Sequence, residues 1–225
     1  MIDPAGFGEV RVKVCGITRL EDGLNAAKAG ADYLGFIASD GFSRSAPIDL
    51  GARLAAETGV RITAVTVDEP IERLARMGLE SAASVLQLHG EEPPETLEAL
   101  RKRGPWKLWK GLRVRSSDEV SRALDRYGEC ADGILLDGWH PEHRGGSGAR
   151  FPWDLVAPLR ESFPRDLDLI AAGGLTPSNV AAAVLELRPD VVDVSSGVEM
   201  EKGIKDAGRV RTFIENAKRA RRTTP

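Results

Sequence analysis

Residues 167–199 read LDLIAAGGLTPSNVAAAVLELRPDVVDVSSGVE and contain the repeating unit that decides the fold. Two short apolar runs, 167–172 and 191–195, flank a longer segment, 177–187, whose apolar residues recur at three- and four-residue spacing. Continuous apolar runs of this length are typical of strands buried on both faces, and the longer spacing is typical of a helix. The stretch therefore predicts a strand, a helix and a second strand parallel to the first.

The same alternation extends along the whole chain of 225 residues. Apolar runs that predict eight strands lie at 10–15, 33–37, 61–67, 85–88, 107–112, 133–137, 167–172 and 191–195. Helical patterns occur between them, for example at 20–29, 50–58, 93–103, 117–127, 177–187 and 207–220, with a weaker one at 152–159. Eight successive βα units predict an α/β fold, a single (β/α)8 TIM barrel. An open doubly wound sheet is the alternative, because strand number alone does not show closure.

No linker or low-complexity stretch interrupts this pattern, so residues 1–225 are expected to form one domain. Residue types typical of helix starts support three of the helices. Thr18 with Glu21 resembles a capping box, Ser116 or Ser117 precedes an acidic turn, and Pro177 after Thr176 fits a first helical position.

Composition excludes several classes of function. Lys and Arg total 31 against 34 for Asp and Glu, and a net charge of −3 gives no field suited to nucleic acid. No run approaches the 18 or so apolar residues of a membrane span. Cys15 and Cys130 form no disulfide framework, and the first residues do not resemble a signal peptide. A cytoplasmic protein without a membrane span or nucleic-acid partner is expected.

Two reactive residues close apolar runs that are far apart in the sequence. Active sites of (β/α)8 barrels lie at the C-terminal ends of the strands, where Cys15 ends the first run and Asp137 ends the sixth. The two side chains are therefore expected to face each other across the mouth as a base and an acid. Cys15 as a small core residue and Asp137 as a helix cap are the structural alternatives.

Glycine-containing turns follow the last two predicted strands. Gly173 and Gly174 follow the seventh strand, and Ser196 and Gly197 follow the eighth. Small residues at these turns allow backbone N–H groups to approach an anion, and this fold usually binds phosphate there. A phosphate cradle is predicted, with plain turns as the alternative.

The loop after Asp137 is long and glycine-rich and is a candidate lid over the ligand. Its glycines include Gly145, Gly146 and Gly148. His140 and His143 lie in this loop without a nearby set of carboxylates or thiolates, so no metal site is expected. The sequence contains no dinucleotide, P-loop, serine-hydrolase or zinc-protease signature, and catalysis is expected to depend on side chains alone.

Six motifs together resemble those of the phosphoribosylanthranilate isomerase family, in the family's order along nearly the whole chain. They are KVCGIT at 13–18, QLHGEE at 87–92, LLD at 135–137, GGSG at 145–148, AGGL at 172–175 and VDVSSGVE at 192–199. The resemblance implies a (β/α)8 enzyme of tryptophan biosynthesis, a monomer or homodimer without cofactor. Its substrate would be the small molecule N-(5′-phosphoribosyl)anthranilate, converted by an Amadori rearrangement to 1-(2-carboxyphenylamino)-1-deoxyribulose 5-phosphate.

The resemblance also implies residue roles. Asp137 matches the family's general acid and Cys15 its general base. Arg44 matches the arginine that binds the anthranilate carboxylate, and His89 lies in a substrate-binding motif. Residues 38–47 depart from the family's usual Phe-x-Pro-x-Ser-x-Arg context, which bears on packing of the aromatic ring.

Two other functions fit the same residues. One is another phosphosugar isomerase or epimerase of this fold; the histidine-pathway isomerase would be expected to have an aspartate where Cys15 stands. The other is a barrel that binds a phosphorylated ligand without catalysis, which has no need of both Cys15 and Asp137.

Overall fold

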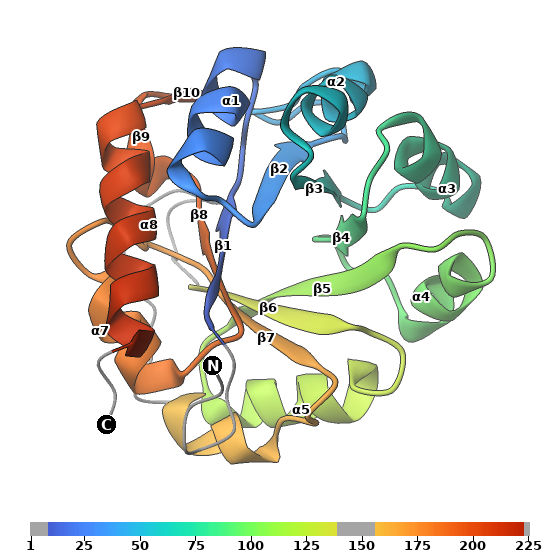
Figure 1. Cartoon of the computed structure of the whole chain (residues 1–225). Coiled ribbons are helices and arrows are strands. Elements are labelled where there is room, and N and C mark those ends of the chain that lie inside the picture. Colours follow the sequence, from blue (N-terminus) through green and yellow to red (C-terminus); the bar gives the residue numbers. More distant parts are fainter. Residues whose placement is uncertain (1–8, 139–155, 223–225) are drawn as a thin grey trace.

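The computed structural model describes residues 9–138 and 156–222, and it forms a closed parallel barrel (Figure 1). Each strand pairs with the next in sequence, and β8 pairs with β1 in the register Lys13 to Asp193, which closes the ring. The TIM barrel prediction is confirmed, and the open sheet is wrong. The strands are β1 (Arg11–Val14), β2 (Tyr33–Ile37), β3 (Arg61–Thr66), β4 (Val85–Leu88), β5 (Lys107–Val114), β6 (Gly133–Gly138), β7 (Asp168–Ala171) and β8 (Val191–Val194).

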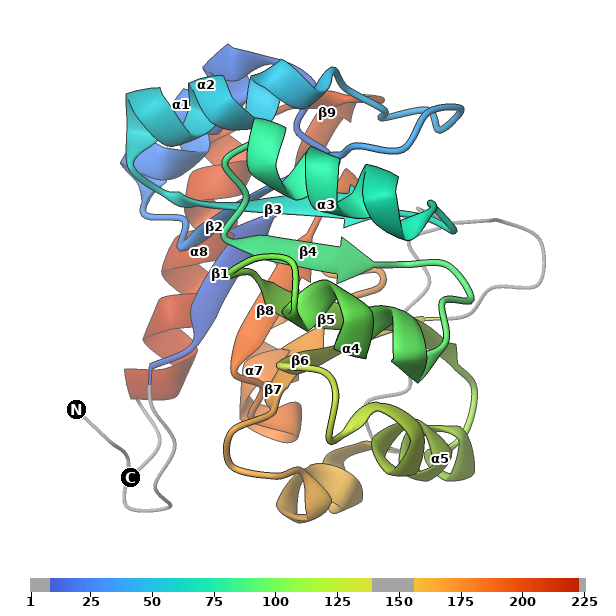
Figure 2. The same ribbon diagram turned by 90° about the vertical axis from the view of Figure 1, so that its right-hand side faces the viewer.

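Helices surround the barrel, and the strands inside it run in one direction (Figure 2). The helices are α1 (Leu20–Ala29), α2 (Ile48–Thr58), α3 (Ile71–Glu80), α4 (Pro94–Arg101), α5 (Ser117–Tyr127), α7 (Val180–Leu187) and α8 (Ala207–Arg222). The weak helical pattern at 152–159 is described only from 156, where the chain forms a 3-10 helix, η1 (Ala157–Ser162). Within the described ranges, no helix has the length and apolar character needed to cross a membrane.

One of the three predicted helix starts is confirmed. The Ser116 hydroxyl accepts a hydrogen bond from the N–H of Glu119 at 3.3 Å and caps α5. Thr18 does not cap α1; its hydroxyl donates to the carbonyl of Gly203 instead (2.7 Å). Pro177 precedes α7 rather than opening it, because the chain first makes a turn and the helix begins at Val180.

Two apolar clusters account for the packing. The larger lies between the strands and the surrounding helices, and the smaller fills the barrel with side chains that include Tyr33 and Trp109. The rings of these two residues lie 5.0 Å apart at 60°, a tilted aromatic contact. Arg11 closes the N-terminal end by donating to Asp168 (2.6 Å) and to the Tyr33 hydroxyl (3.0 Å). The interior is therefore filled, and the C-terminal mouth remains for a site.

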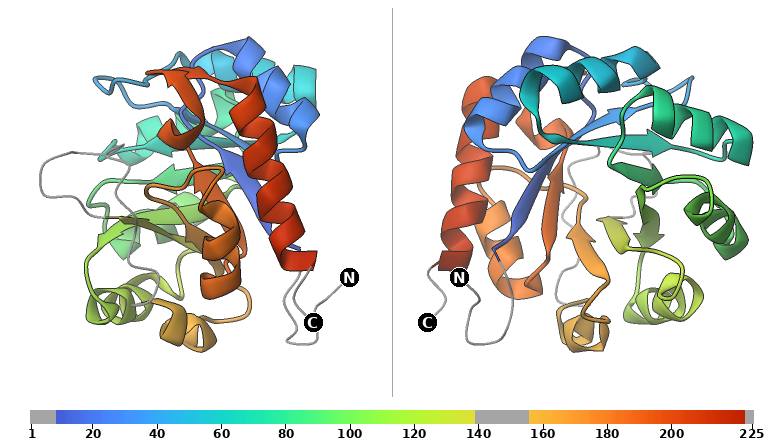
Figure 3. Two further views of the ribbon diagram at one scale, coloured as in Figure 1. Left: turned by 90° about the vertical axis from the view of Figure 1, so that its left-hand side faces the viewer. Right: turned by 45° about the vertical axis from the view of Figure 1, so that its right-hand side comes forward.

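A short hairpin that the sequence patterns did not predict follows β8. After a 3-10 turn, η2 (Ser196–Val198), strands β9 (Glu199–Glu201) and β10 (Ile204–Lys205) pair antiparallel. The hairpin lies beside α1, and α8 then runs along the outside of β1 (Figures 1 and 3). The N–H of Lys205 donates to Asp22 of α1 (3.2 Å). The hairpin thereby brings Glu199 and Lys205 to the loop that follows β1.

Candidate active site

Cys15 lies where β1 ends at the mouth of the barrel. Its backbone N–H donates to the carbonyl of Val194 at 2.8 Å, which holds it against the end of β8. The residue is buried, with 8% of its surface exposed. Burial raises the pKa of the thiol, while the positive charges of Lys13 and Lys205 act in the opposite direction. Cys15 is thus a buried thiol in a charged environment, unlike an ordinary apolar core residue.

Asp137 lies near the end of β6, with 24% of its side chain exposed. Its Oδ2 is 3.7 Å from Nε2 of His89, which follows β4. On its other side, a Cβ at Gly173 would lie 2.8 Å from Asp137 Oδ1, so the carboxylate is adjacent to the loop after β7. Two strands, β7 and β8, separate β6 from β1 around the ring. Cys15 and Asp137 therefore approach the mouth from different sides.

His89 reaches Asp137 across β5. Its Nδ1 lies 3.1 Å from Nε2 of Gln87, which fixes one side of the ring. A Cβ on Gly111 of β5 would lie only 2.3 Å from the same Nδ1. The ring therefore occupies space that exists because the facing strand carries a glycine.

Arg44, in the loop after β2, is held by a carboxylate of the hairpin. Its Nε and Nη2 each donate to one oxygen of Glu199 at 2.7 Å, a bidentate pair in which Arg44 is 15% exposed. The Cδ of Arg44 lies 2.8 Å from where a Cβ of Gly16 would stand, and Gly16 has φ +67°. The glycine after Cys15 thus allows the arginine to pack beside the thiol.

Glu199 also binds a lysine, at 2.8 Å from Nζ of Lys205. Burial favours the neutral acid, but hydrogen bonds from Arg44 and Lys205 outweigh it and lower the pKa of Glu199. The pKa of Lys205 is lowered, because burial outweighs the attraction of Glu199. The sequence patterns gave no role to Glu199 or Lys205. Glu199 ends the motif at 192–199 and Lys205 follows it, but the loop that the two residues contact is visible only once the hairpin is seen in the structure.

The turn after β7 has the backbone conformation that glycine allows. Gly173 and Gly174 have φ of +79° and +65°. Asn179 fixes the turn, since its Oδ1 accepts from Thr176 N–H (2.7 Å) and its Nδ2 donates to Gly174 C=O (2.9 Å). Within the described chain the N–H groups of Gly173 and Gly174 have no hydrogen-bond acceptor. They remain available to a ligand.

The turn after β8 packs directly on the turn after β7. A Cβ at Gly197 would lie 1.9 Å from the carbonyl oxygen of Leu175, which is too close for any side chain. Ser196 and Gly197 belong to the 3-10 turn η2. Contact between the two loops therefore explains why residue 197 is a glycine. The sequence alone suggested a different reason, namely room for an anion to approach the backbone.

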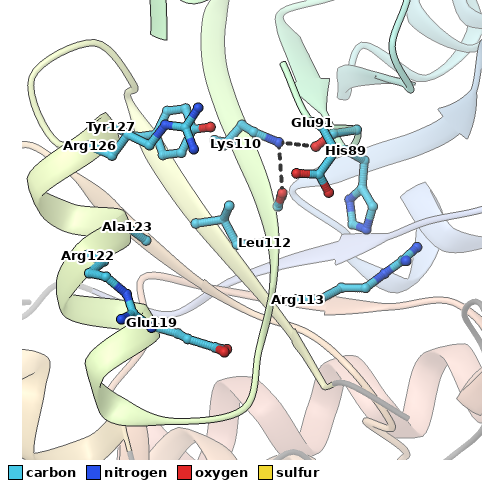
Figure 4. Close-up of a pocket in the computed structure, with 12 residues that line it drawn as sticks. His89, Glu91, Lys110, Leu112, Arg113, Glu119, Arg122, Ala123, Arg126 and Tyr127 are labelled. Atoms are coloured by element: carbon cyan, nitrogen blue, oxygen red, sulfur yellow. Dashed lines mark hydrogen bonds between the residues drawn. The ribbon is translucent and has the colours of Figure 1, made fainter. Parts of the chain in front are cut away.

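A cavity of about 530 Å³ adjoins the mouth between α5 and the loop after β4 (Figure 4). It shares His89 with the candidate site, but Cys15 and Asp137 do not line it. Its charged lining has both signs: Lys110, Arg113, Arg122, Arg126, Glu91 and Glu119. Lys110 is already bound to Gly90 C=O (2.6 Å) and Glu92 (3.2 Å). The cavity lies beside the pair of reactive residues, and its mixed charge indicates no particular ligand.

Some predicted residues lie outside the described residues, namely the lid glycines Gly145, Gly146 and Gly148, together with His140 and His143. In the part of the chain that is described, no three His, Cys, Asp or Glu side chains are grouped so that they could hold a metal ion.

Comparison with known proteins gives a consistent result. Residues 12–216 match the family model described as N-(5′-phosphoribosyl)anthranilate (PRA) isomerase. A protein of that name from Pseudomonas putida is 40% identical over 219 residues, covering 95% of this chain and all of the relative. Another from Thiobacillus denitrificans is 41% identical over 211 residues, covering 93% and 98%.

Similar solved structures are described by the same activity as these sequence relatives. The crystal structure of phosphoribosyl anthranilate isomerase from Thermotoga maritima is 38% identical with a TM-score of 0.83, covering 93% of this chain and 98% of that one. A second structure, of an isomerase in complex with reduced 1-(o-carboxyphenylamino)-1-deoxyribulose 5-phosphate, is 36% identical with a TM-score of 0.80 and the same coverage.

Proposed function

Because this chain belongs to the N-(5′-phosphoribosyl)anthranilate isomerase family, and is an isomerase of tryptophan biosynthesis, we propose that Cys15 and Asp137 are its general base and general acid. The substrate is N-(5′-phosphoribosyl)anthranilate and the reaction is an Amadori rearrangement to the 1-deoxyribulose product. The observation that carries the assignment is the position of the two residues in one closed barrel: Cys15 directly follows β1, and Asp137 lies next to the last residue of β6.

The first step belongs to Asp137. Its carboxylic acid donates a proton to the ribose ring oxygen as the bond from that oxygen to C1′ breaks. The nitrogen lone pair forms a double bond to C1′, which gives a protonated Schiff base. A partly exposed carboxyl with His89 nearby is suited to exchange this proton between turnovers.

The second step belongs to Cys15. Its thiolate removes the proton from C2′, and the electrons of that C–H bond form a C1′–C2′ double bond as the iminium is neutralised. The resulting enolamine takes a proton at C1′ and loses the hydroxyl proton at C2′, which leaves the ketone. Because only the thiolate is a base, the positive groups near Cys15 favour this step.

Arg44 would bind the anthranilate carboxylate while Glu199 holds it. The pair with Glu199 uses Nε and one hydrogen of Nη2. In the described part of the chain Nη1 has no acceptor, so a second edge of the planar guanidinium is available to a carboxylate. Glu199 then serves to orient Arg44 beside Cys15.

The turns after β7 and β8 would bind the phosphate. Support comes from the N–H groups of Gly173 and Gly174, which lack acceptors among the described residues. The backbone of Ser196 and Gly197 lies against that turn through the contact of Gly197 with Leu175. Phosphate there and carboxylate at Arg44 would place the ribose between Cys15 and Asp137.

We further propose that residues 1–225 form a single domain and act in the cytoplasm, where two free cysteines are stable. The Thermotoga maritima enzyme is described as dimeric. For this chain both monomer and homodimer remain predictions, and gel filtration with light scattering distinguishes them.

The test is consumption of N-(5′-phosphoribosyl)anthranilate, followed by its fluorescence with purified protein. We expect turnover by the wild type, and kcat lower by about 10² or more in Cys15→Ser and in Asp137→Asn, as is usual for general acid–base groups. Asp125→Asn, on α5, is the matched control and should keep wild-type kcat. Binding of the substrate without turnover by the wild type would favour the non-catalytic barrel.

A further inference from the structure

Two charged residues occupy the inside of the barrel directly below Cys15. Lys13 on β1 and Asp193 on β8 are paired in register, and Lys13 Nζ lies 2.8 Å from Asp193 Oδ2. Side chains alternate along a strand, so Lys13 and Cys15 point to the same side of β1, while Val12 and Val14 belong to the outer apolar core. The Lys13 side chain is completely buried and that of Asp193 is 9% exposed.

Stability alone is a poor explanation for this pair. Burying two charges costs desolvation free energy that their attraction repays only in part, and apolar residues of similar volume usually serve as well. Barrel interiors are usually filled by branched apolar side chains. Moreover, Oδ1 of Asp193 is buried without a hydrogen-bond partner within the described residues. The pair is incompletely satisfied, which points to a role beyond packing.

The lysine lies beside the thiol. A Cβ at Gly35 of β2 would lie 2.9 Å from both Cys15 Sγ and Lys13 Cε, so the two side chains border the same glycine. Among the described residues, the charged groups that face Cys15 from the packed elements are Lys13 from β1, Asp193 from β8, Lys205 from β10 and Arg44 from the loop after β2. Burial opposes the charge of Lys13, but Asp193 and Cys15 together raise its pKa, so it remains an ammonium.

We propose that Lys13, fixed by Asp193, is a positioning residue that holds a positive charge beside the Cys15 thiol and makes its thiolate accessible. The inference rests on the proposed role of Cys15 as the base. Asp193 has a double effect: it keeps Lys13 charged and in place, and its own negative charge limits how far the thiolate is favoured. Among the charges near Cys15, that of Lys13 has the largest effect on the thiol and Asp193 the next, with opposite sign.

The test measures the thiol directly, without relying on turnover. In a Cys130→Ala background, Cys15 is the remaining cysteine, and its alkylation by iodoacetamide is followed by mass spectrometry from pH 6 to 10. Alkylation proceeds through the thiolate. We expect Lys13→Met to move the pH profile upward by about one unit or more, so that alkylation at pH 7 is at least roughly tenfold slower.

Two further variants separate this effect from a loss of structure. Lys110→Met removes another buried lysine with a carboxylate partner, Glu92, but far around the ring on β5, and should leave the profile unchanged. Lys13→Met/Asp193→Asn leaves no unpaired buried charge, so it should fold even where the single variant does not. The pH profile of alkylation in this double variant should also move to higher pH. The shift should be smaller than in Lys13→Met, because the negative charge of Asp193, which opposes the thiolate, is lost as well.

An unchanged alkylation profile in folded Lys13→Met, or in the double variant, would overturn the proposal. The pH profile of kcat/KM in the same variants provides the link to catalysis. If the alkylation profile moves and the acid limb of kcat/KM does not, Lys13 governs the thiol as proposed but Cys15 is not the base. The effect of Lys13 on the thiol and the role of Cys15 as the base can therefore be refuted independently of each other.

Discussion

The imidazole Nε2 of His89 lies 3.7 Å from Oδ2 of Asp137, and it reaches that position over Gly111 of the intervening strand. β4 and β6 are not neighbours, so a residue on one can approach a residue on the other only if β5 leaves room. The absence of a side chain at Gly111 is therefore required for His89 to reach Asp137.

This relationship predicts that Gly111→Ala imitates the loss of His89. The added Cβ would lie 2.3 Å from Nδ1 and displace the ring from Asp137. We expect His89→Ala and Gly111→Ala each to lower kcat/KM by about tenfold, and the double variant to be no worse than either alone, because both remove one interaction. Steady-state kinetics check this. Multiplicative losses would show that Gly111 acts independently of His89.

A second prediction concerns the pair between Arg44 and Glu199. If Glu199 orients Arg44, Glu199→Gln should raise KM in the same direction as Arg44→Ala but by a smaller factor, with little change in kcat, because carboxylate binding acts in the ground state and the transition state alike. Glu201→Gln, an exposed neighbour on β9, is the control. A lowered kcat with unchanged KM would contradict the assignment.

The same carboxylate predicts how stability depends on pH. The pKa of Glu199 is lowered in the folded protein, so its ionised form stabilises the fold above the unfolded value of 4.5, and this contribution is lost as pH falls through the lower folded value. Glu199→Gln should therefore lower Tm at pH 7, and the gap to wild type should be smaller at an acidic pH below 4.5, because the contribution is lost as pH falls through the lower folded value. Melting curves at both pH values test this; a gap independent of pH would exclude the electrostatic explanation.

Asn179 offers a cleaner test of phosphate binding than Gly197. Because a side chain at 197 would collide with Leu175, Gly197→Val would disturb both loops whether or not an anion binds there. Asn179→Ala instead removes the two hydrogen bonds that shape the turn after β7. We expect it to raise the inhibition constant of inorganic phosphate about tenfold or more, whereas the neighbouring Ser178→Ala should not. Equal constants for wild type and Asn179→Ala would place the anion elsewhere.

Much of the fold could be predicted because its signals are local. Apolar runs predicted β2 and β4 with their observed ends, and α1 and α5 likewise, since core-facing residues set both the period and the length. The predicted start of α7 at Pro177 was wrong, because Asn179 completes a turn after Pro177 before the helix begins. The hairpin of β9 and β10 was missed because strands of two or three residues carry no periodic signal.

From the residue pattern alone, the candidate catalytic pair was predictable because its members lie at strand ends, whereas Arg44 and His89 came from the family resemblance. Cys15 and Asp137 could be selected because the fold makes strand ends reactive. Lys13 could not, since a lysine in an apolar run says nothing about which residue it meets; the register of β1 with β8 brings it to Asp193. The roles of Gly16, Gly35 and Gly111 depend on side chains from other strands and are visible only in three dimensions.

The assignment of ring opening to Asp137 and of C2′ proton removal to Cys15 is the central claim, and one measurement tests it most directly. With substrate deuterated at C2′, the kinetic isotope effect on kcat is compared in wild type, Cys15→Ser and Asp137→Asn. If Cys15 removes the C2′ proton and Asp137 opens the ring, Cys15→Ser should show a primary effect at least as large as the wild type, because proton removal limits its rate. Asp137→Asn should show an effect near unity, because ring opening limits its rate. A full primary effect in Asp137→Asn with none in Cys15→Ser would reverse the two roles and contradict the account.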